Sequence, residues 1–227
     1  MHHTRRRWLF ALVVACTAAT VYSAQTPEVI TIAGVTVIDT INGRALPGRT
    51  VTIRDGTIVS ATAGDSPPQG ARRIDGRGKF LIPGLWDMHT HHQMTGESSL
   101  PLYVANGVTG TRDMGADLDF ILPLRERVAS GRVLGPRIVA SGPILDDRPA
   151  DWPYRLSVRT GDDARKAVQL LKQRGVDFIK VHDRTSPEAY EAIADEAKRQ
   201  GLTFAGHLPR GITFEAAAAA GQRTIEH

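Results

Sequence analysis

The alternation of short apolar runs with amphipathic helical stretches, which begins at Leu85, constrains the fold of this chain most strongly. Such alternation is typical of βαβ units, in which the strands form a parallel sheet. The two clearest predicted helices span residues 162–174 and 187–200, with apolar residues at i, i+3, i+4 and i+7. Each is bounded by residues that cap and end helices, namely Thr160 with Gly175 and Ser186 with Gly201.

The predicted strands of this region end near six positions, which are His91, Asp113, Ser141, His182, Leu208 and His227. Their succession fits the βα units of a TIM barrel, whose eight units need about 250 residues. Residues 84–227 supply about six strands. The expected fold class is therefore α/β, with an incomplete (β/α)8 barrel over residues 84–227.

Residues 24–83 carry a different pattern, with short β-branched runs separated by turn residues. The pair Asp55-Gly56 between two such runs is a strong hairpin signal. We expect a small β-sandwich domain over residues 24–83, which precedes the barrel.

The N-terminal residues resemble a targeting segment. Three arginines, Arg5 to Arg7, precede the apolar stretch Trp8–Ala19, which is shorter than the about 20 residues of a membrane-spanning helix. Residues 1–23 are expected to be a signal peptide for export to the bacterial periplasm. The alternatives are a lipoprotein anchored at Cys16 and a twin-arginine signal. No transmembrane segment is expected after signal removal.

The composition and net charge of the chain limit the classes of binding partner that can be expected. The three N-terminal arginines account for most of the formal net charge of +4, and aromatic residues make up 6% of the chain. No nucleic-acid partner is therefore expected. The single cysteine excludes a disulfide within the chain. The expected partner is a small-molecule substrate, and association into a homo-oligomer stays open.

Six of the eight histidines stand at predicted strand ends, namely His89, His91, His92, His182, His207 and His227. In a TIM barrel these ends hold the active site. His89 and His91 point to the same side of their strand, where two imidazoles can bind a divalent metal, usually zinc. His92 has the opposite parity and is not expected to be a ligand. Asp87 is placed to orient a histidine from behind.

The stretch 83–91, Pro-Gly-Leu-Trp-Asp-Met-His-Thr-His, resembles the first-strand signature of the amidohydrolase superfamily. Further stretches are similar to the next five strands in order, namely residues 107–115, 135–143, 178–181, 205–207 and 224–227. The likeness is greatest to the branch with imidazolonepropionase-like enzymes and prolidase-like dipeptidases. These enzymes are metal-dependent hydrolases on a (β/α)8 barrel with an attached β-sandwich.

The resemblance implies two divalent metal ions, zinc by expectation, bound by His89, His91, Lys180, His207 and His227. It implies that Lys180 is carboxylated by CO2, and burial in an apolar strand would favour the neutral amine that this reaction needs. It also implies hydrolysis of a C–N bond, in an amide, a cyclic amide or a dipeptide, by a metal-activated hydroxide.

Further residues near the predicted site have weaker signals. His182 shares the parity of Lys180 and is a candidate to touch substrate. Arg112 and Asp113 are expected to form a structural ion pair. The long segment 144–158 is interpreted either as a loop that covers substrate or as a solvated surface insertion.

The catalytic aspartate of the superfamily follows the eighth strand, so it is expected beyond His227. We therefore interpret the chain as an N-terminal part of an amidohydrolase and do not expect turnover by the 227-residue chain alone. The alternatives are an esterase or lactonase at the same metals, an inactive truncated metal-binding chain, and an exported metal-binding module.

Overall fold

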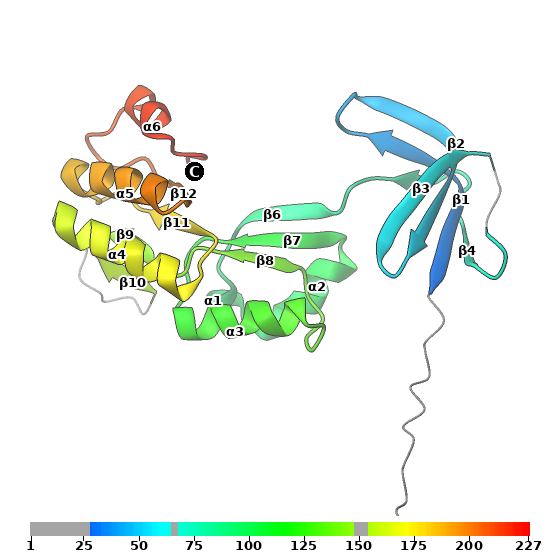
Figure 1. Cartoon of the computed structure of the whole chain (residues 1–227), viewed down its shortest axis with the longest axis horizontal. Helices are drawn as coiled ribbons and strands as arrows, with labels where there is room; N and C mark the ends of the chain where they lie inside the picture. Colours follow the sequence, from blue (N-terminus) through cyan, green and yellow to red (C-terminus); the bar gives the residue numbers. More distant parts are fainter. Residues whose placement is uncertain (1–27, 65–67, 148–153) are drawn as a thin grey trace, which may run out of the picture. The chain divides into compact units, whose positions relative to one another are not determined.

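The computed structural model describes residues 28–64, 68–147 and 154–227. The chain divides into two compact units between Ile82 and Pro83, and each is described by itself (Figure 1). The predicted signal segment and Cys16 lie outside the described residues. Within the described ranges, no helix combines the length and the apolar character needed to cross a membrane.

The first unit contains one five-stranded sheet. Its strands are β1 (Val29–Asp39), β2 (Arg44–Arg54), β3 (Thr57–Ala63), β4 (Arg72–Asp75) and β5 (Phe80–Leu81). The order is β3-β2-β1-β4, with β5 also paired to β1. A sandwich needs two sheets packed face to face, and the described residues of this unit form a single sheet, so the predicted β-sandwich is not confirmed.

The predicted hairpin at Asp55-Gly56 is confirmed. Arg54 of β2 pairs with Thr57 of β3, so Asp55 and Gly56 alone form the turn between the two strands. Both have positive φ, 49° for Asp55 and 75° for Gly56, as a two-residue turn of type I′ requires.

The second unit confirms the predicted alternation of strands and helices. Its strands are β6 (Leu85–Thr90), β7 (Val108–Asp113), β8 (Arg137–Ala140), β9 (Ile144–Asp146), β10 (Arg155–Ser157), β11 (Phe178–Val181) and β12 (Thr203–Gly206). Its helices are α1 (His92–Thr95), the 3-10 helix η1 (Glu97–Ser99), α2 (Leu100–Ala105), α3 (Leu118–Ala129), α4 (Gly161–Arg174), α5 (Pro187–Arg199) and α6 (Phe214–Ala220).

The strands of this unit form two parallel sheets. One has the order β6-β7-β8 and the other β10-β9-β11-β12. A parallel bridge joins Gly206, at the end of β12, to Ile225, where the sequence predicts a sixth strand. Because parallel strands end on the same side of their sheet, each sheet gathers the residues that follow its strands at one edge.

The two predicted helices are present as α4 and α5. Thr160 and Asp163 form a capping box at the start of α4, and Gly175 ends it in the left-handed conformation. Ser186 caps α5 through the backbone N–H of Ala189. The two helices pack on each other beside β11 (Figure 1), and their apolar faces share one buried core with this strand. This core includes Val168, Leu171, Ile179, Val181, Tyr190 and Ile193.

In its described part, residues 144–147 and 154–158, the long segment is not a solvated surface insertion. Its described part forms β9 and β10, which pair with each other in parallel, and Leu145 of β9 pairs with Val181 of β11. The side chains of Asp146 and Arg155 are buried, and their separation of 3.5 Å forms an ion pair. This ion pair links β10 to β9, and residues 148–153 lie outside the described part.

Candidate active site

The structure brings the predicted histidines together in a row of rings. His89 lies 5.4 Å from His91 and 4.7 Å from His227, measured between ring centroids. His227 lies 4.9 Å from His207, whose ring is 4.1 Å from that of His182. These residues come from the ends of β6, β11 and β12 and from the C-terminal segment. The row therefore joins positions that are far apart in sequence.

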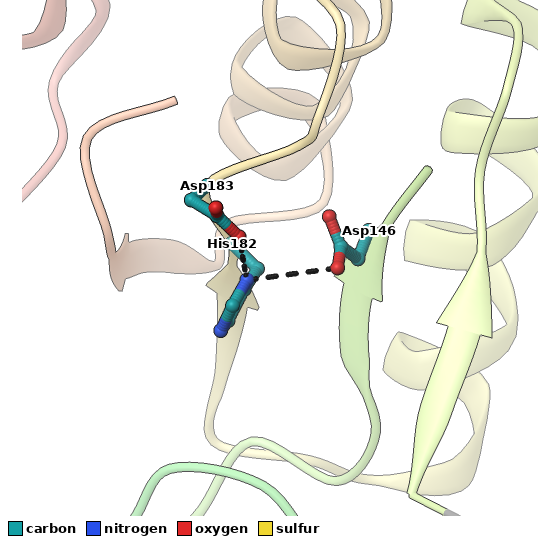
Figure 2. Close-up of side chains that lie close together, drawn as sticks. All are labelled: Asp146, His182 and Asp183. Carbon is teal, nitrogen blue, oxygen red and sulfur yellow. Dashed lines mark hydrogen bonds and ion pairs between the residues drawn. The ribbon is translucent and has the colours of Figure 1, made fainter. Parts of the chain in front are cut away.

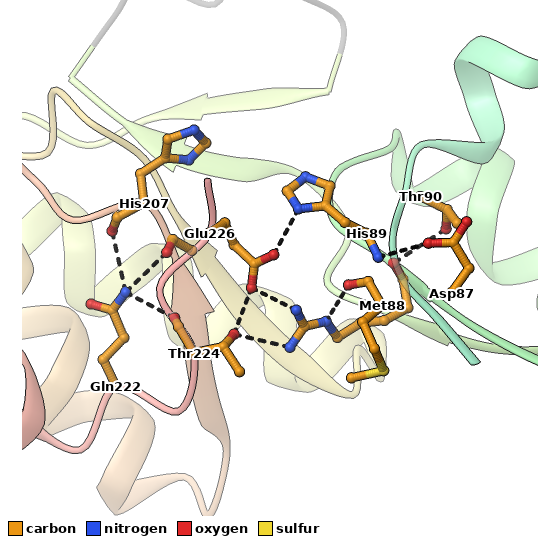
Figure 3. A network of polar contacts seen from close by, with 10 residues as sticks. Asp87, Met88, His89, Thr90, His207, Gln222, Thr224 and Glu226 are labelled. Carbon is orange, nitrogen blue, oxygen red and sulfur yellow. Dashed lines mark hydrogen bonds and ion pairs between the residues drawn. The ribbon is translucent and has the colours of Figure 1, made fainter. Parts of the chain in front are cut away.

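His89 and His91 each use Nδ1 for a hydrogen bond within the protein. His89 Nδ1 lies 2.7 Å from Glu226 Oε2, and His91 Nδ1 lies 3.0 Å from the carbonyl oxygen of Gly115 (Figure 3 shows the first pair). A carboxylate and a carbonyl only accept, so Nδ1 carries the proton in both neutral rings. The lone pair of each ring is then on Nε2, as metal binding by histidine needs.

Asp87 does not orient an imidazole, contrary to the sequence-based expectation. Its Oδ1 accepts a hydrogen bond from the backbone N–H of His89 at 3.1 Å (Figure 3). This contact joins the Asp87 side chain to the main chain two residues further along the same strand, so it holds the backbone of β6. The acceptor for the His89 ring comes instead from Glu226, at the other end of the unit.

Lys180 is buried on β11, with 1% of its surface exposed. Burial, and after it the charge of Arg112, lower its pKa to about 8 against the opposing effect of the nearby Glu226 carboxylate. The expectation that burial favours the neutral amine is confirmed. Near neutral pH an appreciable fraction of this amine is unprotonated and nucleophilic.

His207 has the most strongly shifted imidazole of the row. Burial is the main cause, and together with the neighbouring His182, Lys180 and His227 it lowers the pKa to about 4. Its buried Nδ1 has no hydrogen-bond partner among the described residues. A row of imidazoles, one with an unsatisfied buried nitrogen, together with a buried lysine, fits a divalent metal such as zinc.

His182 is held by two carboxylates (Figure 2). Its Nδ1 lies 2.5 Å from Asp183 Oδ1 and 3.6 Å from Asp146 Oδ2. Burial lowers the pKa of His182, while both carboxylates act to raise it. The prediction that His182 touches substrate stays a prediction.

The same three side chains offer ligand atoms that lie within 4.8 Å of one another, so they form a second grouping that could hold a metal. Their charges, however, already have partners. Arg155 Nε lies 3.5 Å from Asp146, whose Oδ1 also accepts the backbone N–H of Arg184, and Arg210 lies 3.7 Å from Asp183. Because these cations already neutralise the carboxylates, we interpret the three side chains as a network that orients His182, and not as a metal site.

Arg112 and Asp113 do not form the ion pair that the sequence suggested. Arg112 Nη2 lies 2.5 Å from Glu226 Oε1, whereas Asp113 accepts the backbone N–H of His92 at 2.7 Å and of Gly115 at 3.2 Å. Adjacent residues on a strand point to opposite sides, so the two side chains face different partners.

Glu226 is the site residue that sequence reasoning missed. Burial raises its pKa, but hydrogen bonds from Thr224 and His89 and the charge of Arg112 outweigh burial and keep the pKa below its ordinary value. The sequence signal that could have identified Glu226 is its position directly before His227, in the stretch 224–227 that resembles the sixth strand of the superfamily. His92, in contrast, is buried against Thr111, with 2.8 Å between its Nε2 and the Thr111 hydroxyl.

Parallel strands with histidines at their carboxyl ends define a class of α/β proteins with a candidate metal centre. Residues 80–227 match the sequence pattern of the amidohydrolase family, and the chain belongs to this family. Ochratoxinase of Aspergillus niger is 24% identical, over 65% of this chain and 43% of that protein. A dihydroorotase of Anaeromyxobacter sp. (strain K) is 35% identical, over 37% of this chain and 18% of that protein.

Solved structures share the fold of this chain. A prolidase complexed with N-methylphosphonate-L-proline superposes with a TM-score of 0.74 at 27% identity, covering 88% of this chain and 61% of that one. The Aspergillus niger ochratoxinase structure has a TM-score of 0.69 at 21% identity, covering 88% and 60%. The chain spans 43% of the length of the ochratoxinase, and 61% and 60% of the lengths of these two structures.

Proposed function

We propose that this protein is a metal-dependent amidohydrolase that hydrolyses a C–N bond in an amide, a cyclic amide or a dipeptide. The observation that carries the proposal is the row of histidine rings His89, His91, His207 and His227 at the ends of parallel strands, with the buried Lys180 close enough to His89 and His207 to lower their pKa values. Membership of the amidohydrolase family and the resemblance to a prolidase and an ochratoxinase support it.

In this proposal His89, His91, His207 and His227 would hold two divalent metal ions, zinc by preference, together with Lys180. The neutral amine of Lys180 would add CO2 and release one proton to solvent, which gives an anionic carbamate with two oxygens that could serve as ligands. When bound, the metals would polarise the scissile carbonyl and supply a nucleophilic water at neutral pH. His182, held by Asp183, would contact the substrate.

In this proposal the second unit supplies about six of the eight strands of a (β/α)8 barrel, namely β6, β7, β8, β11, β12 and the segment bridged at Ile225. The two parallel sheets would then be parts of one barrel sheet. The general base is expected to be an aspartate after the eighth strand, outside this chain. Loss of such a proton acceptor typically lowers the rate about 10²- to 10⁴-fold.

The test is an assay of the protein made from its complete reading frame. Zinc-loaded protein should release amino acids or ring-opened products from a panel of Xaa-Pro dipeptides and cyclic amides. A chelator should abolish the turnover, and added zinc should restore it. Turnover of esters or lactones alone would favour the esterase alternative, and turnover that survives metal removal would contradict the proposal.

We further propose that the protein is exported and that the segment before about Ala24 is removed or lipidated. The arginines ahead of Trp8–Ala19 support this proposal. N-terminal sequencing of protein from its native host tests it. An intact Met1 in the cytosol would contradict export, and a lipid on Cys16 would establish the lipoprotein alternative.

A further inference from the structure

Glu226 joins two groups from different strands, the imidazole of His89 (Figure 3) and the guanidinium of Arg112. Its Oε2 lies 2.7 Å from His89 Nδ1, and its Oε1 lies 2.5 Å from Arg112 Nη2. The hydroxyl of Thr224 donates to the same Oε1 at 2.6 Å. The Glu226 side chain is only 9% exposed, so these donors replace the water that a carboxylate otherwise binds.

Arg112 holds His89 from a second direction. Its Nε donates to the backbone carbonyl of Met88 at 2.7 Å, directly before His89 in the chain. Its Nη1 donates to the Thr224 hydroxyl at 3.0 Å, and its guanidinium carbon lies 5.9 Å from the ring centre of Phe178. All three nitrogens are engaged, so the guanidinium is fixed on the strand that carries His89 and on the carboxylate that contacts the ring.

We propose that Glu226, held by Arg112, is a positioning residue that keeps the proton of His89 on Nδ1 and leaves the Nε2 lone pair for a metal ion. This inference rests on the proposed function. A carboxylate cannot donate, so the neutral ring must donate from Nδ1. An anionic acceptor also makes the imidazole a stronger ligand than a neutral acceptor does.

The neighbouring histidine provides an internal comparison. His91 has the neutral carbonyl of Gly115 in the place that Glu226 takes beside His89. The two histidines of the His-x-His stretch therefore differ in the charge behind the ring, and loss of Glu226 should affect His89 and leave the His91 contact intact.

The tautomer of His89 tests the positioning directly, in the metal-free 227-residue chain. Nitrogen NMR of ¹⁵N-histidine-labelled protein, with the His89 signal assigned from a His89→Gln variant, should show the Nδ1-protonated form. In Glu226→Ala the His89 signal should move toward the Nε2-protonated form, whereas His91 should keep its signal. An unchanged His89 tautomer in Glu226→Ala would overturn the proposal.

Zinc affinity gives a second readout in case Glu226→Ala does not fold. Glu226→Gln keeps the shape of the side chain and removes its charge, and zinc competition with a chelating dye should show about 10- to 100-fold weaker binding. The matched control is Glu196→Gln on α5, which also removes a buried carboxylate paired with an arginine, Arg199. The control should keep wild-type affinity.

The outcomes separate this inference from the proposed function. Equal losses of affinity in Glu226→Gln and Glu196→Gln, or no loss in Glu226→Gln, would overturn the positioning role. A wild-type chain that binds no zinc, or a complete protein that binds zinc without hydrolysis, would contradict the proposed function, while the tautomer of His89 would still decide the role of Glu226.

Discussion

The side-chain amide of Gln222 donates to the backbone carbonyl of His207 at 3.2 Å, and so ties the C-terminal segment to the end of β12 (Figure 3). The same nitrogen lies 3.0 Å from the carbonyl of Gly206 and 3.1 Å from that of Thr224. The hydroxyl of Tyr190 donates to the amide oxygen of Gln222 at 2.7 Å. One side chain thus fixes the backbone at His207 and, through Thr224, the segment that leads to His227.

We expect Gln222→Ala to destabilise the chain by about 1–3 kcal/mol, because part-buried carbonyls and the Tyr190 hydroxyl lose their partner. Urea unfolding measures the change. Asn106→Ala is the control, since its exposed side chain makes one hydrogen bond, to the carbonyl of Leu102. It should change stability by less than about 0.5 kcal/mol. Equal stability of the two variants would contradict the role of Gln222.

Glu196 predicts acid sensitivity. A hydrogen bond from Gln200 and others from Gln169 and Arg199 lower its pKa from 4.5 to about 2. Between these values the unfolded chain binds more protons than the folded chain, so the stabilisation is complete above pH 4.5 and is lost as the pH falls toward 2. In urea unfolding at several pH values, Glu196→Gln should lose less stability than wild type between pH 5 and 2. An identical pH dependence in both proteins would contradict this assignment.

The close packing of β6 on β7 leaves no room for a side chain at Gly110. Trp86 and Gly110 pair in register, and a Cβ on Gly110 would overlap the indole ring of Trp86. Gly110→Ala should therefore destabilise the chain by about 1–3 kcal/mol, although alanine is ordinarily preferred over glycine in a strand. In a Trp86→Leu background the same substitution should cost less, as a double-mutant cycle can measure. A cost independent of residue 86 would contradict the overlap.

Lys180 predicts a metal content that depends on carbon dioxide. If its carbamate is a ligand, Lys180→Ala should bind less zinc, and added short carboxylic acids should restore part of the binding. Carbon-dioxide-free buffer should lower the zinc content of the wild type as well. The exposed Lys172 provides the control variant Lys172→Ala, with unchanged zinc content. Wild-type metal content in Lys180→Ala would count against a lysine-derived ligand.

Local patterns in the sequence were sufficient to predict α4, α5, the hairpin and the candidate histidines. The ends of α4 are determined by Thr160 and Gly175, and the turn at Asp55-Gly56 by residues that accept positive φ. These signals act between residues a few positions apart. The burial of Lys180 also follows from its apolar neighbours on β11.

Only the tertiary structure decided how many sheets the first unit forms and which side chains face the histidines. Glu226 meets His89 across 137 positions, Arg112 turns to Glu226 and away from the adjacent Asp113, and Asp146 reaches His182 from a segment that could have been a surface loop. Strand order and register determine such contacts, and neither can be predicted from a local pattern of residues. The sequence by itself therefore identified the candidate ligands, and the packing of distant strands selected the groups that orient them.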